Sequence, residues 1–424
     1  MGRPSDESVA AVAEVSSRPR EATSALSSRN YRIYLIGTVF SMVGIWIQRL
    51  AIGWQAWQLS ESAFVVGVVA AVQFLPILVL TPFFGVLVDR IRARSGSVIM
   101  NALMAVVAAV LGIVTLSGGI SIEILAGLAL IHGLIVSFHT PTRLALIPDL
   151  VPARLFPSAV ATSSIAFNLS RFAGPTLAGA VIALWGLGWA YIINALTYLP
   201  VILSLALLKI DHASKPARIK APYLEQLREG LRYTRDHPTI RLAIMIAAIG
   251  AFFGRGVLEL MPAYAGMVFG GGSTSLAILM SAAGIGAIIA SFFMSSTRNQ
   301  GRLKEVLFFG GIGVGLAVML LGLSKNMVVG VAAVALLGLS GTLVGVGSQS
   351  LVQVSVEDRL RGRVMSLWTL VAMGGPAVGS LAGGAIMREF GAALTSFIFA
   401  VLCFGPMALI GVRLRAGKPV AGQD

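Results

Sequence analysis

Twelve long apolar stretches dominate the sequence, and they limit its possible folds more than any other feature. Each has about 20 residues or more, which lets a helix cross a hydrocarbon layer of roughly 30 Å at 1.5 Å per residue. Only 12% of the 424 residues are charged, whereas soluble domains have about 25%. We therefore predict an all-α integral membrane protein. The stretches lie near residues 31–57, 64–88, 97–117, 121–141, 157–183, 189–208, 240–268, 273–296, 303–323, 327–350, 363–387 and 392–412.

The longest polar interruption, residues 209–239, separates the stretches into two sets of six. Leu224, Leu227 and Leu231 recur within it at helical spacing, which predicts a helix on the cytoplasmic membrane surface. A solvated tether is the alternative. The expected units are a disordered cytoplasmic tail (1–30), a six-helix bundle (31–208), the linker (209–239), a second six-helix bundle (240–412) and a cytoplasmic tail (413–424).

The two halves repeat short sequence elements. Two pairs carry the repeat: Val151, Arg154 and Leu155 match Val356, Arg359 and Leu360, and Gly174-Pro175 matches Gly375-Pro376. The offsets are 205 and 201 residues, and the difference is about one helical turn. Repeats of this kind indicate two bundles related by pseudo-twofold symmetry, which transporters rock against each other around a central site.

The basic residues predict the orientation of the chain. Of the 32 Lys and Arg residues, 27 fall in the tails, in the loops on the same side as the tails or at the span ends that border them, three deeper within spans and two in the opposite loops. Cytoplasmic loops carry an excess of Lys and Arg. We therefore expect a multi-pass protein of the cell membrane with both termini in the cytoplasm.

A charged loop follows the second apolar stretch, with the sequence Gly85-Val-Leu87-Val-Asp89-Arg90-Ile-Arg92-Ala-Arg94. It resembles the signature loop of the major facilitator superfamily, which lies at the same place among twelve spans. The resemblance implies a gating motif in which Asp89 meets the start of the eleventh span, where Arg361 and Arg363 stand. In the alternative interpretation, the arginines of the loop only fix the topology.

The fifth apolar stretch carries Asn168-Leu-Ser-Arg171-Phe-Ala-Gly174-Pro175-Thr-Leu-Ala-Gly179. This segment resembles the glycine-proline motif that exporters of the superfamily have in their fifth span. The eleventh stretch repeats the device with Gly375, Pro376 and two further glycines at four-residue spacing. Glycine allows a close backbone approach and proline bends a helix, so the motif predicts a hinge; a packing seam of small residues is the alternative, and the two are compatible.

Together with Trp46-Ile-Gln48-Arg49 and the segment 356–363, these motifs resemble the branch of the superfamily that contains the enterobactin exporter and macrolide efflux proteins. The resemblance implies the major facilitator fold and export driven by an ion gradient, usually protons. The fourth stretch departs from the drug-proton antiporters: Ala129 precedes His132-Gly133 where they have an arginine before a Gln-Gly pair. Their coupling scheme is therefore not transferred to this chain.

Charges inside the spans mark the candidate site, because a charge at the centre of a span costs roughly 3 kcal/mol. Glu259 is the acidic residue that falls well within a span, Arg49 and Arg255 stand 206 residues apart, and Arg171 adds a third cation. We hypothesise a positively charged central cavity in which Glu259 is the coupling carboxylate. The other candidates near it are polar residues of the first half, Gln48, His132 and Asn168.

In the alternative, these charges form a structural network. Arg255 lies one turn before Glu259, so the two side chains would satisfy each other, while Arg49 would reach the membrane interface. His132 would then be a hydrogen-bonded packing residue.

Several other functions lack the residues that they need. The net charge of +14 is spread over the ends of the apolar stretches rather than gathered as in nucleic-acid-binding proteins. The sequence has no phosphate-binding loop of an ATP-driven pump, no pair of histidines at metal-ligand spacing and no convincing catalytic constellation. We predict a secondary active transporter, a monomer without a cofactor, that exports a small amphipathic or anionic compound of siderophore or drug type in exchange for protons. Uptake of a metabolite is the alternative, and a membrane enzyme or a sensor with a transporter-like body represents a different class.

Overall fold

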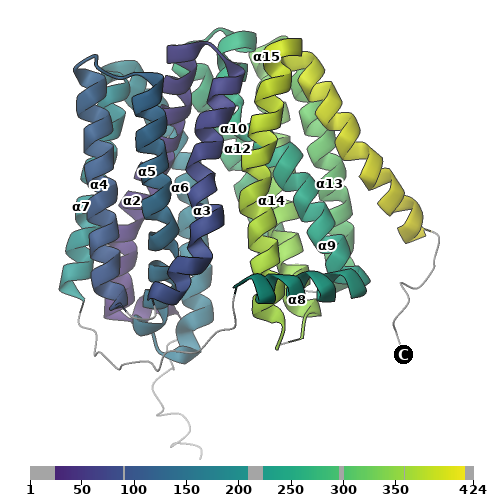
Figure 1. Ribbon diagram of the computed structural model, residues 1–424, viewed down its shortest axis with the longest axis horizontal. Coiled ribbons are helices and arrows are strands. Elements are labelled where there is room, and N and C mark those ends of the chain that lie inside the picture. The colour runs from purple at the N-terminus through teal and green to yellow at the C-terminus, as the bar shows by residue number, and fades with distance from the viewer. Residues whose placement is uncertain (1–23, 89–90, 209–222, 296–299, 358, 416–424) are drawn as a thin grey trace, which may run out of the picture.

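The computed structural model describes residues 24–88, 91–208, 223–295, 300–357 and 359–415. Long helices gather into two bundles that stand side by side (Figure 1). The first bundle contains α2 (Arg29–Ser60), α3 (Ala63–Val88), α4 (Ala93–Leu116), α5 (Ile122–Leu146), α6 (Phe156–Trp185) and α7 (Leu187–Leu207). The second contains a segmented helix that begins with α9 (Pro238–Ile249), then α12 (Gly272–Ser295), α13 (Gln300–Leu323), α14 (Met327–Ser355) and α15 (Arg361–Arg415).

Eleven helices of the described ranges are long and apolar enough to cross a membrane. One of them, α15, has 55 residues, about 80 Å at 1.5 Å per residue and far more than one bilayer needs. Gly391 interrupts it with a left-handed φ of 76° and ψ of 171°. In Figure 1 the final part of α15 folds back and descends toward the C-terminus. The all-helical membrane fold is confirmed, and the count of twelve spans stays a prediction that requires each arm of α15 to cross the bilayer.

The N-terminal boundary differs from the expected tail of residues 1–30. A short 3-10 helix, η1 (Ala25–Ser27), precedes α2, and Ala25 is fully buried. The Ala25 amide donates to Ser158 Oγ at 3.0 Å, and Ser28 Oγ donates to the Leu150 carbonyl at 2.6 Å. Ser24 and Ser28 also cap η1 and α2, and these serine contacts explain why order begins before the apolar stretch. Residues 1–23 lie outside the described part of the chain.

The linker contains the predicted helix, α8 (Tyr223–Asp236). It lies across one end of the second bundle, roughly perpendicular to the long helices (Figure 1). Gly230 sits against the backbone of Arg363 at the start of α15, where a larger residue would not fit. Leu231 is 57% exposed, so part of the predicted apolar face is not covered by the protein. This exposure fits the predicted position on a membrane surface.

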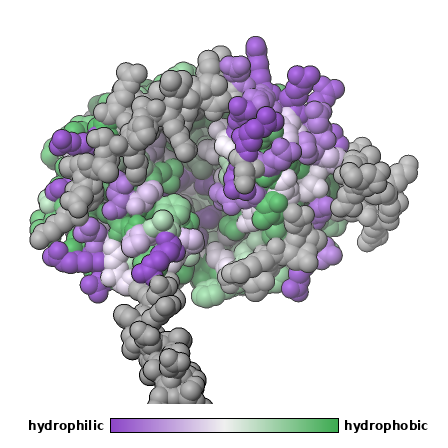
Figure 2. All heavy atoms as spheres, turned by 90° about the horizontal axis from the view of Figure 1, so that it is seen from below, coloured by the Kyte–Doolittle hydropathy of each residue, from purple (hydrophilic) through white to green (hydrophobic). Residues whose placement is uncertain are grey.

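The two halves pack together most closely at the end away from α8. There α3 contacts α15 and α6 contacts α12. Gly67 of α3 lies against the Ser380 backbone, and Gly179 of α6 against Ala277. The opposite face, seen from below in Figure 2, is hollowed near its centre between the halves. The molecule is therefore closed on one side of its midplane and recessed on the side of α8.

Candidate functional site

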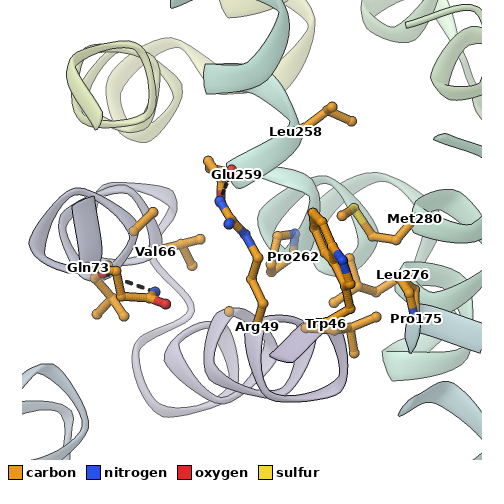
Figure 3. Close-up of a pocket in the computed structure, with 14 residues that line it drawn as sticks. Trp46, Arg49, Val66, Gln73, Pro175, Leu258, Glu259, Pro262, Leu276 and Met280 are labelled. Carbon is orange, nitrogen blue, oxygen red and sulfur yellow. Dashed lines mark hydrogen bonds and ion pairs between the residues drawn. The ribbon is translucent and has the colours of Figure 1, made fainter. Parts of the chain in front are cut away.

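A cavity lies where α2, α3 and α6 of the first half meet the segmented helix and α12 of the second (Figure 3). Its walls are mostly apolar, with a few polar side chains among them. The lining residues are Trp46, Arg49, Leu50, Gly53, Val66, Val69, Ala70, Gln73, Pro175, Leu258, Glu259, Pro262, Leu276 and Met280. Apolar walls with few polar groups are typical of sites for small molecules.

The segmented helix carries Glu259 into this cavity. After α9 the chain continues as a π-helix, η4 (Gly250–Arg255), then α10 (Gly256–Glu259), α11 (Met261–Tyr264) and a second π-helix, η5 (Ala265–Phe269). Pro262 has no N–H to donate to the carbonyl four residues earlier, and Leu260 leaves helical geometry at φ −90° and ψ 2°. Glu259 therefore lies at a break in the helix. Breaks and π-turns of this kind often occur at functional sites.

An ion pair between Arg49 and Glu259 joins the two halves inside the cavity (Figure 3). The two side chains are 26% and 13% exposed. The Arg49 guanidinium also lies 4.8 Å from the ring centre of Phe74 and 5.5 Å from that of Trp46. Such contacts favour a cation over an aromatic face. Arg49 is thus held in the interior, at the junction of the halves.

This pairing differs from the alternative structural network. Glu259 pairs with Arg49 of the other half rather than with Arg255 of its own helix, and Arg49 does not extend to an interface. Regular α-helical spacing would place Arg255 and Glu259 on one face. The α-helical residues Gly256–Glu259 keep that spacing, so the packing of the halves, which brings Arg49 of α2 to Glu259, decides the pairing.

Arg171 and Arg255 do not line the cavity, but they add positive charge near it. Both lie close enough to interact electrostatically with Glu259, and Arg171 interacts with both of the other arginines. The Arg171 guanidinium lies 5.7 Å from the Trp46 ring centre. Within the described part of the chain, neither arginine forms an ion pair. The centre therefore holds three guanidinium groups and one carboxylate, an excess of positive charge.

The three polar candidates of the first half do not line the cavity. Gln48 is 2% exposed and accepts a hydrogen bond from Asn194 Nδ2 of α7 at 2.5 Å, so it links two helices of one bundle. Asn168 donates to the Ser164 carbonyl of its own helix at 3.0 Å. His132 Nε2 is buried and has no hydrogen-bond partner among the residues described.

The glycine-proline motifs make close helix contacts. Gly174 lies against the Cβ of Trp46, Pro175 lines the cavity, and Gly179 meets Ala277 of the other half. In α15, Gly375 sits against Ala251 of η4, and the adjacent Pro376 is buried. These close contacts are the ones expected of a packing seam of small residues. The role of the motifs as a hinge stays a prediction.

The gating motif is described only in part. Gly85 belongs to α3, while Asp89 and Arg90 lie outside the described residues. Arg94 donates from Nε and Nη2 to the carbonyls of Leu205 and Ala206 at the end of α7, each at 2.7 Å. Such donors satisfy the last carbonyls of a helix.

At the start of α15, Arg363 forms an ion pair with Glu229 of α8, and Arg361 is exposed. The sequence did not predict the contact with Glu229, because it joins residues 134 positions apart.

Several residues that line the cavity were not among the candidates predicted from the sequence. Trp46 stands three positions before Arg49 in the quoted motif, and Gln73 is a polar residue in an apolar stretch, so both carried a signal. Pro262 and Met280 carried none, because prolines and methionines occur throughout these spans.

Comparison with known proteins identifies the family. The model of the family described as transmembrane secretion effector, MFS_3, matches residues 21–422. The chain belongs to this family of the major facilitator superfamily. The named relatives of the chain are transporters, not enzymes. The chain is therefore a multi-pass membrane protein and a secondary transporter of small molecules.

The sequences of three relatives align with most of this chain. The Staphyloferrin A transporter of Staphylococcus aureus is 26% identical over 329 residues, 77% of this chain and 81% of the relative. Macrolide efflux protein A of Streptococcus pyogenes is 22% identical over 336 residues, 78% and 82% of the two chains. Enterobactin exporter EntS of Escherichia coli O1:K1 / APEC is 23% identical over 390 residues, 91% and 90%.

Solved structures agree on the fold. The nucleoside transporter NupG superposes with a TM-score of 0.65 at 14% identity, covering 90% of this chain and 99% of its own. A bacterial homolog of the human lysosomal transporter Spinster, in an inward-facing and unoccupied conformation, gives a TM-score of 0.63 at 15% identity, with coverage of 87% and 88%. At these identities the likeness shows the major facilitator fold alone.

Proposed function

We propose that this transporter exports a small amphipathic or anionic compound of siderophore or drug type in exchange for protons. The observation that carries the proposal is the Arg49–Glu259 ion pair, which joins the halves at the centre of the fold beside two further arginines. The names of the relatives, which include an enterobactin exporter and a macrolide efflux protein, support the substrate class and the direction.

The positive-inside pattern supports cytoplasmic termini in the cell membrane. With that orientation α8 lies on the cytoplasmic side, and the hollowed face of Figure 2 is the cytoplasmic one. The halves are then closed toward the exterior, where α3 meets α15 and α6 meets α12. The cavity is thus placed to receive a compound from the cell. Rocking the halves about the site, as a monomer, would expose the compound to the other side.

Glu259 is the group suited to couple this motion to protons. Protonation neutralises the carboxylate, so the Arg49–Glu259 attraction between the halves is lost. Exchange of substrate for protons requires that the two compete for the site, because each must leave before the other binds. The competition follows if the exported compound donates a hydrogen bond or presents a cation to the Glu259 carboxylate. A proton arriving from the exterior then displaces the compound.

Uptake is the second candidate function, and the Arg49–Glu259 ion pair could serve it as well. If an anionic group of the substrate takes the place of Glu259 at Arg49, protonation of Glu259 frees that arginine and strengthens substrate binding. Proton and substrate would then bind cooperatively and travel together. The direction of transport therefore depends on whether the substrate contacts Glu259 or Arg49.

Accumulation assays separate these two modes. Cells with and without the protein are given a panel of siderophores, drugs and lysolipids, with and without a protonophore. Export predicts lower accumulation in cells with the protein, and the protonophore should raise it to the level of the control cells. Higher accumulation that falls when the gradient collapses would contradict export and establish uptake.

A further inference from the structure

The indole of Trp46 carries a buried hydrogen-bond donor at the wall of the cavity. Trp46 is 7% exposed, and its Nε1 has no hydrogen-bond partner in the part of the chain described here. Figure 3 shows the nitrogen on the side of the ring that faces Leu276 and Pro175, away from Arg49. A buried N–H without a partner costs free energy, and among the side chains of the described residues that hold such an unpartnered atom, Trp46 is the one that lines the cavity.

Helix α6 holds this donor in place. Phe167 packs against the indole with ring centres 5.8 Å apart, and Gly174 allows α6 to approach the Trp46 Cβ. Arg171 stands between them in sequence and places its guanidinium 5.7 Å from the same ring. Trp46 thus lines the cavity, while Arg171, which is not one of the lining residues, lies over the Trp46 ring from α6. Fixed donors lower the ordering cost of binding.

The donor set selects an oxyanion. An indole gives one N–H and a guanidinium gives several, and neither accepts a hydrogen bond. Arg171 forms no ion pair with the acidic residues of the described ranges, so its charge is free for a ligand. A guanidinium matches the two oxygens of a carboxylate. Beside it, Leu276 and Met280 offer an apolar surface (Figure 3).

We propose that Trp46 and Arg171 form a subsite for the carboxylate of an amphipathic substrate whose apolar body lies against Leu276 and Met280. The inference rests on the proposed function in that the site takes a small-molecule substrate, but it does not depend on proton coupling. It names the chemical class of that substrate. It also separates the group that anchors the anion from Glu259, which belongs to the ion pair with Arg49.

Equilibrium binding without a proton gradient tests the subsite. The protein is placed in nanodiscs of zwitterionic phosphatidylcholine, so that no anionic lipid competes, and titrated with radiolabelled 1-naphthoate or the neutral 1-naphthamide. We expect saturable naphthoate binding. The Kd should rise about tenfold or more in Arg171→Gln and about threefold to tenfold in Trp46→Phe, which keeps a ring but loses the N–H. Naphthamide should bind more weakly, and Arg171→Gln should leave its affinity unchanged.

Two matched controls keep the result specific. Arg388→Gln removes an exposed arginine that lies over Phe64, and Trp185→Phe removes an exposed tryptophan at the end of α6. Both should bind naphthoate like the wild type. Each variant is accepted only if it elutes as a single species, and Arg171→Lys, which retains the charge, should recover part of the affinity.

Three results would overturn the subsite. They are the absence of saturable naphthoate binding at millimolar concentrations, equal affinity for naphthoate and naphthamide, and normal naphthoate binding by Trp46→Phe. Failure of proton coupling gives a different pattern, in which uphill transport is independent of Glu259 while the naphthoate results stand. The two proposals can therefore fail separately.

Discussion

Helix α2 of the first half and the segmented helix of the second occupy corresponding places in the repeat, yet they are built differently. Helix α2 runs without interruption from Arg29 to Ser60, whereas its counterpart, residues 238–269, changes between α and π geometry and breaks at Leu260. Ala56 stands where the second half has Pro262, 206 positions later, as Arg49 does for Arg255. The first half thus supplies a continuous wall, and the second supplies an irregular element that carries Glu259.

The difference suggests a division of roles at the ion pair. A regular helix fixes its side chains through an unbroken series of backbone hydrogen bonds. A helix with a proline and π-turns has fewer such constraints around Glu259. We infer that Arg49 is the fixed partner and Glu259 the one that moves when the pair opens. The following substitutions test this contrast, from the largest expected effect to the smallest.

Moving the proline to the regular helix should have the largest effect. Ala56→Pro removes the backbone hydrogen bond to Ile52 and places a ring against that carbonyl, in a fully buried position. We expect a loss of about 3 kcal/mol or more in stability, seen as little monodisperse protein in fluorescence-detected size exclusion. Pro262→Ala is the matched change and should yield folded protein with an equal or higher melting temperature. Equal damage by both substitutions would contradict the contrast.

Removing the arginines should separate the paired from the unpaired cation. Arg49→Gln leaves the Glu259 carboxylate without its partner, and because both side chains are partly exposed we expect a loss of about 1 to 3 kcal/mol. Arg255→Gln should change stability by less than about 1 kcal/mol, because Arg255 forms no ion pair in the described ranges. Thermal unfolding of both variants in one detergent provides the measurement. A larger loss for Arg255→Gln would contradict the assigned pairing.

Disturbing the tight contact between α2 and α6 of the first half should have a smaller effect on stability. A Cβ at Gly174 would meet Trp46 and the Val43 carbonyl, so Gly174→Ala should cost about 1 to 2 kcal/mol. Gly345 of α14 is the control, because its missing Cβ would point into open space. Gly345→Ala should be neutral or stabilise by up to about 1 kcal/mol, since alanine favours helices. Similar melting temperatures for the two variants would argue against a constrained α2–α6 contact.

The smallest effect is expected at the linker. The Glu229–Arg363 side chains are 43% and 28% exposed, so Glu229→Gln should lower stability by less than about 1 kcal/mol. Transport should stay near the wild-type rate. A transport defect as large as that of Arg49→Gln would instead assign α8 a direct part in the movement of the halves.

Much of the fold follows from the sequence because lipid makes strong demands on it. A span must be long and apolar, so the hydrophobic stretches indicated the helices, and the periodic leucines indicated α8. The details depended on local hydrogen bonds and turns instead. Ser24 and Ser28 order the segment before α2, and Gly391 turns α15 back with a conformation that hydropathy does not report.

The charged residues of the candidate site could be predicted from the sequence, but not which of them form the ion pair. Charges are costly in a membrane, which explains why Arg49, Arg171, Arg255 and Glu259 all gather at the centre. Which of them pair depends on how the two halves pack against each other, and that packing is not visible in one sequence. Gln48 looked equally suitable, yet it faces α7, because its neighbour Arg49 takes the side toward the cavity.

The most direct test of the central claim is proton-driven transport by Glu259→Gln in proteoliposomes, once a substrate is in hand. Glutamine keeps the shape of the side chain but neither carries the charge nor exchanges a proton at neutral pH. We predict that an imposed pH gradient no longer drives uphill transport, while exchange of labelled for unlabelled substrate without a gradient continues. Glu123→Gln, an exposed acid in the first turn of α5, should behave as the wild type. Unchanged uphill transport by Glu259→Gln would contradict the claim that the ion pair between the halves couples transport to protons.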